Sequence, residues 1–521
     1  MTMRRTRTWA AVLAILALAA ASCGGGSSDD ATDGAPDDAT DDSAKADPDA
    51  VMRFMWGTPG GSNYDPHEAF NPFVNIFLYP AYDRLLEMTP DSELRPMLAE
   101  SWEFQEDDTV LRLNLRQDVT FHDGEPFNAE AVKANIERGQ TLKSSSVKPD
   151  LASVDEVVVV DEYTVDLMLG GPGAALPALL SDRAGMMVSP AAFDNEDLDL
   201  RPVGTGAYQV DDHQPGSLIT YEPFPDYWDP EAQTLGGIEI SMQLDPEARL
   251  RALQADEIDA TTLNPDQIEA AEAAGLEVQT SPIASAFLLY LNKTKPGLDD
   301  PLVREAISLA IDRDGINDAL HLGLCPPSAQ IFPPGYWAGD PDVEADPYDV
   351  EEAQSLMEEA GYGDGLALSA VVVNVPFYLS QLEVVQEQLA EIDIELTVTA
   401  LEPAELLGRF LSGKADMTYS QWPGAVDPAK TVATLLSEKG LLNPGGYTNP
   451  QIDELAAEGA SIIEQEDREP IYQELSRVAA EDRFHIVVCN PEAVYVVDPA
   501  VQGLVPTLGL SYEFRGVTIS K

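Results

Sequence analysis

The sequence predicts an α/β protein of two or three lobes, and three observations support this prediction. Beyond Val51 the chain is too long to fold around one simple core. In its C-terminal half, helical and strand patterns alternate. These patterns predict a helix through Leu356 that ends at Gly361, a strand near 368–373, a helix through 382–389 and a strand at 394–398. This alternation is typical of a mostly parallel sheet with helices on both faces. The last segment, 495–520, returns to strand-like sequence, and we expect it to rejoin the N-terminal lobe.

Two helices have well-marked starts. The stretch 99–138 indicates a strand, a tight turn and a helix, with Asn128 as the N-cap and Gly139 at the helix end. A second helix is expected over 300–316, where Asp300 caps a proline at the first helical position.

The N-terminus resembles a secretion signal. Three arginines precede an apolar run that is too short to span a bilayer comfortably. Cys23 then follows the small residues Ala21 and Ser22, which resembles the lipobox of bacterial lipoproteins, where this cysteine is acylated. The alternative is a plain secreted protein with a structural Cys23. The next residues, to Ala50, are almost free of apolar side chains and predict a flexible acidic tether.

Charge and cysteine content limit the class of partner. The chain carries 91 acidic and 30 basic residues, which argues against nucleic acid as a partner. A saline habitat and plain solubility both explain such acidity. Two further cysteines, Cys325 and Cys489, can form a disulfide in an oxidising compartment, although the sequence alone does not place them within bonding distance.

Enzyme signatures are missing from the sequence. The five histidines are scattered without metal-ligand spacing, and His122 belongs to a turn motif that indicates a structural role. The chain contains no Gly-x-Ser-x-Gly nucleophile elbow. We therefore predict a protein that is not an enzyme, has no cofactor and holds no metal.

A series of short motifs along the chain resembles the family 5 extracellular solute-binding proteins, the oligopeptide, dipeptide and nickel type that serve ATP-binding-cassette (ABC) importers. In order, these motifs are Tyr82-Asp83-Arg84-Leu85, Leu98-Ala99-Glu100-Ser101-Trp102, Leu115 to Gly124, Gly204-Thr205-Gly206-Ala207-Tyr208, Asp226-Tyr227-Trp228, Leu253 to Asp259, Val303 to Ile307, Ile311-Asp312-Arg313, and Trp422 followed by Asp427-Pro428. Each motif is weak alone. Their common order over most of the chain is specific.

This resemblance implies a two-lobed periplasmic-binding-protein-like clamp with an extra subdomain and mixed, mostly parallel sheets, closing over a buried ligand. The expected divisions are a lipoprotein signal peptide at 1–22, a tether at 23–50, lobe I at 51–85, 200–291 and 490–521, its extra subdomain at 86–199, and lobe II at 292–489. Two apolar segments, 287–291 and 485–488, fit the crossings between lobes. The implied protein is a monomer, anchored outside the cell membrane or in the periplasmic space, with permease and ATPase subunits as partners.

The resemblance also marks a departure at the ligand site. Peptide-binding members hold the peptide amine with an aspartate three residues after a tryptophan. Here that tryptophan matches Trp422, and Ala425 stands three residues on. Asp427 is the candidate replacement as a cation anchor, although it also matches the Asp-Pro pair.

Other candidate ligand contacts have a packing alternative. Trp422 is expected to stack on the ligand, against the alternative of packing between lobes. Trp56 precedes a glycine-rich turn whose backbone could approach a ligand, and it could equally start a plain connection. Asn292 could bond ligand or hinge, Trp337 falls in a rim loop, and Phe377 is at least as consistent with core packing. The full candidate set is Trp56, Gly57, Thr58, Ser62, Tyr64, Asn292, Trp337, Phe377, Trp422 and Asp427.

The sequence therefore predicts the extracytoplasmic binding component of an ABC importer for a short peptide or peptide-like solute. Alternatives left open are an opine, oligosaccharide or metal chelate as ligand, a tethered receptor not coupled to import, and a secreted hydrolase.

Overall fold

The computed structural model describes residues 46–57, 63–69, 72–106, 108–509 and 511–520. The predicted signal peptide, Cys23, Thr58 and Ser62 lie outside these residues. Among the described helices, none is long and apolar enough to cross a membrane.

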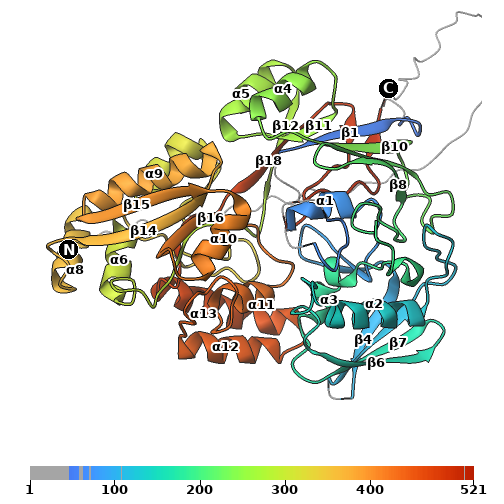
Figure 1. Ribbon diagram of the computed structural model, residues 1–521, viewed down its shortest axis with the longest axis horizontal. Helices are drawn as coiled ribbons and strands as arrows, with labels where there is room; N and C mark the ends of the chain where they lie inside the picture. The colour runs from blue at the N-terminus through green and yellow to red at the C-terminus, as the bar shows by residue number, and fades with distance from the viewer. Residues whose placement is uncertain (1–45, 58–62, 70–71, 107, 510, 521) are drawn as a thin grey trace, which may run out of the picture. The chain divides into compact units, whose positions relative to one another are not determined.

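Lobe I is built on a seven-stranded mixed sheet (Figure 1). Its strands, in spatial order, are β12 (Glu277–Pro282), β18 (Glu492–Val497), β11 (Ala260–Thr262), β1 (Val51–Trp56), β10 (Gly237–Met242), β9 (Leu218–Pro223) and β8 (Tyr208–Gln214). The associated helices are α1 (Asn75–Leu78), α4 (Pro246–Gln254) and α5 (Ile268–Ala273), and the pair β19 (Val501–Gln502) and β20 (Thr518–Ile519) closes the chain. Strand β18 confirms that the C-terminal segment rejoins the N-terminal lobe.

The subdomain carries a four-stranded antiparallel sheet. Its strands are β4 (Ala99–Gln105), β5 (Val110–Leu115), β7 (Thr164–Leu169) and β6 (Val154–Asp161), joined by the pair β2 (Leu86–Met88) and β3 (Leu94–Pro96) and the helices α2 (Ala129–Thr141) and α3 (Leu176–Leu179). Asn128 caps α2 as predicted, because its side chain accepts a hydrogen bond from the backbone of Ala131 at 3.0 Å. Gly139 does not end the helix. It lies inside α2, where an added Cβ would meet Leu151 at 2.7 Å, so its role is close packing.

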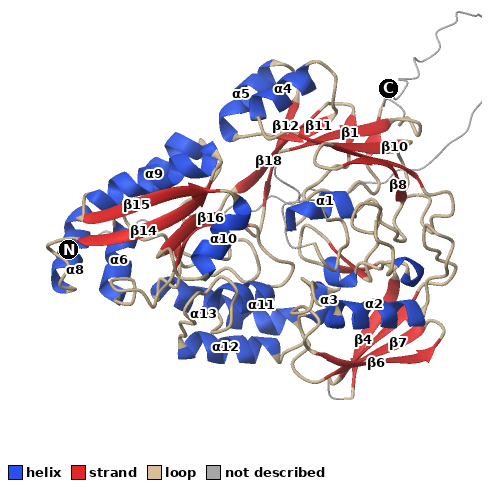
Figure 2. Cartoon of the chain, viewed as in Figure 1, coloured by secondary structure: helices blue, strands red, loops and turns tan. Residues whose placement is uncertain are grey.

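Lobe II combines a five-stranded sheet with most of the helices (Figure 2). The strands, in spatial order, are β15 (Ile394–Leu401), β14 (Leu366–Val373), β16 (Met417–Trp422), β13 (Ala286–Leu291) and β17 (Ile486–Cys489). The helices are α6 (Pro301–Leu309), α7 (Arg313–Ile316), α8 (Val350–Glu359), α9 (Pro376–Ala390), α10 (Pro403–Leu411), α11 (Pro428–Thr431), α12 (Pro450–Ala460) and α13 (Gln465–Glu481). The predicted helix over 300–316 is two helices, because Asp312 caps a new start by accepting from the backbone of Gly315.

The sheets correct the expectation that parallel pairing dominates. β14 runs parallel to β15 and β16, and β1 runs parallel to β10 and β11. The other pairings between strands are antiparallel. Alternation of helices and strands occurs in the stretch 350–422, and the expectation extended that local rhythm to the whole fold.

Strand β13 shows where the lobes divide. All six of its residues are buried, with Phe287, Leu289 and Leu291 in one core and the alternate residues in the core on the opposite face. β13 therefore belongs to lobe II, and the first crossing is the segment 283–285 rather than the strand itself. The second crossing follows Cys489, and Asn490 donates a side-chain hydrogen bond to the carbonyl oxygen of Ser285 at 3.0 Å. This bond ties the two crossings together.

The predicted tether is also shorter than expected at its C-terminal end. Ala46 forms a bridge with Ser520, and the backbone of Asp47 donates to Ile519 at 2.8 Å. Residues 46–50 are therefore part of lobe I.

Residues of the short family motifs connect lobe I to its subdomain. His122 accepts from the backbone of Gly204 at Nδ1 and donates from Nε2 to the carbonyl oxygen of Gly206. Asp83 accepts from Trp228 at 2.6 Å and Tyr227 at 3.2 Å. These contacts join segments that are far apart in the sequence, and they support the structural role predicted for His122.

Two histidines make stability sensitive to acid. His485 has the same arrangement as His122, since it accepts from the backbone of Leu291 and contacts the carbonyl oxygen of Leu435. Burial lowers the pKa of His122 to about 4 and of His485 to about 3. These histidines bind protons more readily in the unfolded chain, where their pKa is about 6.5, than in the folded protein. The free energy of unfolding therefore falls as the pH drops below about 6.5, by about 2 kcal/mol per histidine at pH 5.

Denaturant unfolding from pH 8 to pH 5 measures this effect. We expect His122→Gln, whose amide can both donate and accept, to flatten the pH dependence. An unchanged profile in that variant would contradict the assignment.

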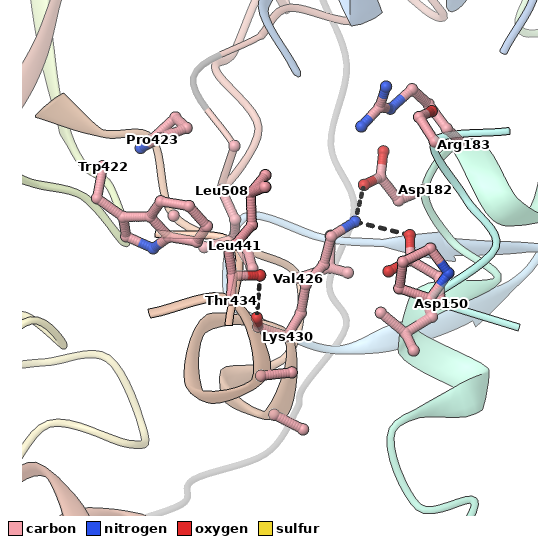
Figure 3. Close-up of a pocket in the computed structure, with 18 of the residues that line it drawn as sticks. Asp150, Asp182, Arg183, Trp422, Pro423, Val426, Lys430, Thr434, Leu441 and Leu508 are labelled. Carbon is pink, nitrogen blue, oxygen red and sulfur yellow. Dashed lines mark hydrogen bonds and ion pairs between the residues drawn. The ribbon is translucent and has the colours of Figure 1, made fainter. Parts of the chain in front are cut away.

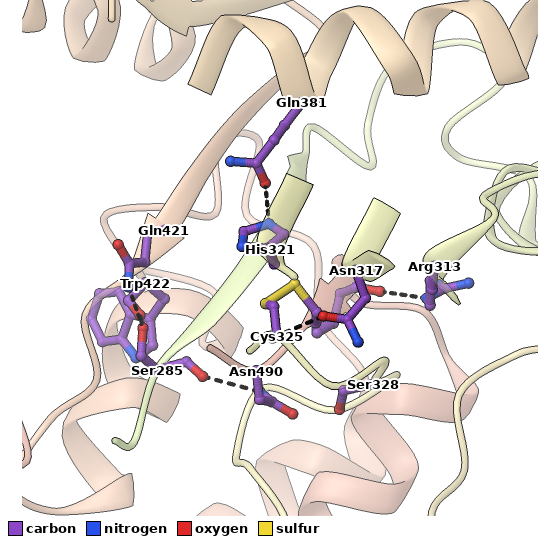
Figure 4. Close-up of a disulfide and its surroundings, with 12 residues drawn as sticks. Ser285, Arg313, Asn317, His321, Cys325, Ser328, Gln381, Gln421, Trp422 and Asn490 are labelled. Carbon is purple, nitrogen blue, oxygen red and sulfur yellow. Dashed lines mark hydrogen bonds between the residues drawn. A yellow bond between two sulfur atoms is a disulfide. The ribbon is translucent and has the colours of Figure 1, made fainter. Parts of the chain in front are cut away.

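Cys325 and Cys489 form a disulfide, with Cα atoms 5.3 Å apart (Figure 4). The bond joins the loop after α7 to the end of β17, next to the second crossing. His321 lies beside it and bonds Gln381. Two sulfurs bonded to each other provide no thiolate, so this cluster offers a metal no anionic ligand.

Candidate functional site

A cavity of about 700 Å³ lies between the two lobes (Figure 3). Lobe I contributes residues of α1 and of the C-terminal loop, the subdomain contributes the segments 146–153 and 172–183, and lobe II contributes 406–410 and 418–442. Figure 3 shows Trp422 and Arg183 on opposite sides of this space. The cavity is therefore bounded by all three parts of the described chain.

Its polar end contains an ion pair that joins the lobes. Lys430, at the C-terminal end of α11, donates to Asp150 at 2.9 Å and to Asp182 at 3.4 Å, both in the subdomain. Burial would raise the pKa of Asp182, but Lys430 and Arg183 outweigh it and lower the pKa to about 2. Burial likewise would lower the pKa of Lys430, and the two aspartates raise it instead. Asp182 and Lys430 are thus both charged at neutral pH.

Arg183 is the unusual group in the wall. Its side chain is buried, and its Nε and Nη1 atoms have no hydrogen-bond partner among the described residues. It follows Asp182 in a short 3₁₀ turn. An isolated bridge between Arg84 and Met186 places that turn beside the segment that connects α1 to β2. Arg84, by contrast, donates from Nη2 to both carboxylate oxygens of Glu513, at 2.8 and 3.0 Å.

Apolar side chains form most of the remaining wall. They come from all three parts of the described chain and include Leu176, Leu179, Leu406, Phe410, Leu441 and Leu508. Trp422 is half-buried, and its Nε1 donates to Thr431 at 3.2 Å, which fixes the ring. A buried apolar surface with a few polar groups at one end is the usual form of a site for a small organic ligand.

The wall around Trp422 is attached to the first crossing. Ser285 donates to the carbonyl oxygen of Trp422 at 2.6 Å. Gly424 adopts a φ of +83°, and a Cβ there would meet the carbonyl oxygen of Ala284 at 2.2 Å. Only glycine fits this close approach. The first crossing and the cavity wall around Trp422 are therefore held in direct contact.

Comparison with known proteins identifies the class of site. Residues 93–441 match the model of the bacterial extracellular solute-binding proteins, family 5 Middle. The chain belongs to this family. The match confirms the predicted solute-binding class, and with it the prediction that the protein is not an enzyme.

Relatives and solved structures agree along nearly the whole length. The glutathione-binding protein GsiB of Escherichia coli (strain K12) is 26% identical over 478 residues, covering 87% of this chain and 92% of that protein. The periplasmic binding protein DppA from Helicobacter pylori, solved in complex with the peptide STSA, has a TM-score of 0.82 at 25% identity, covering 91% of this chain and 98% of that one. AgaA from A. tumefaciens R10, solved with agropinic acid, has a TM-score of 0.80 at 23% identity, covering 91% and 99%. The predicted two-lobed periplasmic-binding-protein fold is confirmed.

Of the predicted contacts in this solute-binding protein, the structure places Trp422 in the cavity wall, together with Ala425. Asp427 is not in the wall. It caps α11 through the backbone of Ala429, and its two carboxylate oxygens accept from Arg468 at 2.8 Å each. A carboxylate that is already paired twice and buried is poorly placed to anchor a ligand cation.

The candidates near the first strand lie in the core of lobe I. Trp56 is buried among Phe54 and Tyr512, and Tyr64 stacks on Phe77. An added Cβ at Gly57 would meet the guanidinium of Arg249 at 2.6 Å, so the close approach that this glycine permits is to another side chain. The structure does not bring these three residues to the cavity.

The other lobe II candidates are also separate from it. Asn292 accepts from Thr294, and Phe377 packs in an aromatic cluster with Phe287 and His321. Trp337 faces a different crevice of about 720 Å³, beside Arg468. Each of these positions serves packing or a turn.

Arg183, Lys430, Asp150 and Asp182 were not predicted. In a chain with so many acidic residues, single aspartates carry no signal, and these four are up to 280 residues apart. The Asp182-Arg183 pair after an apolar stretch was the only local hint.

Proposed function

We propose that this protein is the extracytoplasmic binding component of an ABC importer, capturing a short peptide or peptide-like organic solute between its lobes. The observation that carries the proposal is a mainly apolar cavity between two hinged lobes, with Trp422 on one side and a buried, unpartnered Arg183 on the other. Lobe closure removes water from the ligand, and the polar groups fix its orientation.

One solved structure and one curated relative support a peptide-like ligand. DppA from Helicobacter pylori holds the peptide STSA, and GsiB is named for glutathione, itself a small peptide. Arg183 suits a carboxylate, because a guanidinium donates two parallel hydrogen bonds to that group.

The N-terminal segment supports membrane attachment. We propose that Cys23 carries a lipid and that the acidic segment after it acts as a tether up to Ala46, where lobe I begins. Anchoring keeps the protein near permease and ATPase subunits, and we propose that it acts there as a monomer.

Ligand binding by the full chain tests the proposal. In a thermal-shift screen of the chain purified in mild detergent, we expect peptide-like solutes to raise the melting temperature, since a ligand held only by the folded state stabilises it. Sugars and metal chelates serve as the comparison classes. A shift with one of those classes and none with peptide-like solutes would overturn the peptide assignment while leaving the binding role intact.

A further inference from the structure

The cavity differs in charge from the chain around it. Four cationic side chains and three carboxylates line it, although the whole chain has three times as many acidic as basic residues. The cations are Arg84, Arg183, Lys430 and Lys439, and the carboxylates are Asp150, Asp182 and Glu513. The wall is therefore slightly cationic within a strongly anionic protein.

Each carboxylate in the wall is already engaged. Asp150 accepts from Lys430, Asp182 accepts from Lys430 and from Asn75 at 2.9 Å, and Glu513 accepts twice from Arg84. A ligand ammonium group would have to share one of these carboxylates with Lys430 or Arg84, whose like charge would repel it. Such a group needs a paired charge once it leaves water, so an amine has no prepared position in this wall.

The positions after Trp422 add no free carboxylate. Ala425 lines the cavity with a methyl group, and Asp427 is bonded to Arg468 outside the cavity. Both routes to an amine anchor considered from the sequence are therefore closed in the structure.

Arg183 shows the opposite condition. Its side chain is 6% exposed, and two of its nitrogen atoms have no hydrogen-bond partner in the described part of the chain. The neighbouring Asp182 interacts with Arg183 through its charge, but its side-chain hydrogen bonds come from Lys430 and Asn75. A buried guanidinium without an acceptor is costly, and a carboxylate bound in the cavity beside Arg183 would supply the opposite charge.

We propose that the ligand is a peptide-like carboxylic acid whose amino group is absent or acylated, with its carboxylate on Arg183 and its apolar body between Trp422 and Leu508. This inference rests on the proposed function, because it names the ligand class for the same cavity. An acylated or absent amine avoids the cost of burying an unpaired ammonium, and the apolar wall receives the remainder.

End-group chemistry tests the inference directly. The full chain is incubated with pooled di- and tripeptides prepared as free peptides, N-acetyl acids, C-terminal amides and doubly blocked forms, and retained compounds are identified by mass spectrometry. We expect N-acetyl acids to be enriched at least tenfold over C-terminal amides and at least as strongly as free peptides. Preference for free peptides over N-acetyl acids by tenfold would overturn the inference but leave the proposed function standing. Retention of none of the four forms would overturn the inference together with the peptide assignment of the proposed function.

Variants locate the carboxylate. For a retained N-acetyl acid, we expect Arg183→Gln to weaken binding about 10- to 100-fold, as for loss of a charged hydrogen-bond partner. Binding of the doubly blocked form should change less than threefold. Arg95→Gln is the matched control, because Arg95 is an exposed arginine in the subdomain paired with Glu93. Equal loss for both ligand forms would overturn the assignment of Arg183, and the end-group comparison on the unmodified chain remains valid if the variant fails to fold.

Discussion

Replacing Arg468 by methionine is expected to lower the free energy of unfolding by about 3–5 kcal/mol, the usual cost of leaving one buried ion-pair partner alone. Asp427 is 3% exposed and accepts two hydrogen bonds from Arg468 at 2.8 Å each. Without Arg468 this carboxylate stays buried with the backbone of Ala429 as its remaining partner. Urea unfolding of the full chain measures the loss.

A second variant separates packing from ligand binding. In Arg468→Met with Asp427→Ser, the serine can still cap α11 and no charge is left buried, so we expect most of the lost stability to return. If Asp427 anchored the ligand instead, Asp427→Ser alone would abolish binding at a temperature where the protein stays folded. A stability loss below about 1 kcal/mol in Arg468→Met would show that the pair is solvated.

Replacing Lys430 by methionine is expected to favour the open state and to weaken ligand binding about 100-fold, corresponding to about 3 kcal/mol. Lys430 is the cation that links Asp150 and Asp182 of the subdomain to α11 of lobe II. In its absence two carboxylates face each other in the closed cavity, and opening the lobes hydrates them.

Small-angle scattering and calorimetry measure the two expected effects. The radius of gyration of the unliganded variant should rise, and the dissociation constant should increase. Lys133→Met is the matched control, since Lys133 forms an exposed ion pair with Glu137 at 3.8 Å, worth about 0.5 kcal/mol or less. Adding Asp150→Asn and Asp182→Asn to Lys430→Met should restore closure. If Lys430→Met binds the ligand with unchanged affinity and has an unchanged radius of gyration, Lys430 does not link the lobes.

The sequence predicted those structural features that depend on neighbouring residues, such as helix caps. Asn128 and Asp300 both cap the helices expected of them, because a cap depends on neighbouring residues alone. The division of the predicted 300–316 helix at Asp312 depends on a cap inside an otherwise helical pattern, which periodicity does not reveal. The place of β13 depends on pairing with β16 and β17, both far away in the sequence.

The site was less predictable than the fold. Trp422 was identified through its match to the tryptophan of the family motif, and it does line the cavity. Trp56 is buried in the core of lobe I, and Phe377 is half-buried in an aromatic cluster of lobe II. Lys430 matters because its partners lie in the subdomain, and Arg183 matters because two of its nitrogen atoms have no hydrogen-bond partner among the described residues. Neither property can be predicted from the sequence alone.

The disulfide between Cys325 and Cys489 has a consequence for biosynthesis. Its cysteines are 164 residues apart, so the bond forms only after the whole segment between them has been synthesised. The reducing cytosol would keep both cysteines as free thiols, whereas an oxidising compartment allows the disulfide to form. Protein produced in the reducing cytosol of an expression host would therefore lack the covalent link beside the second crossing.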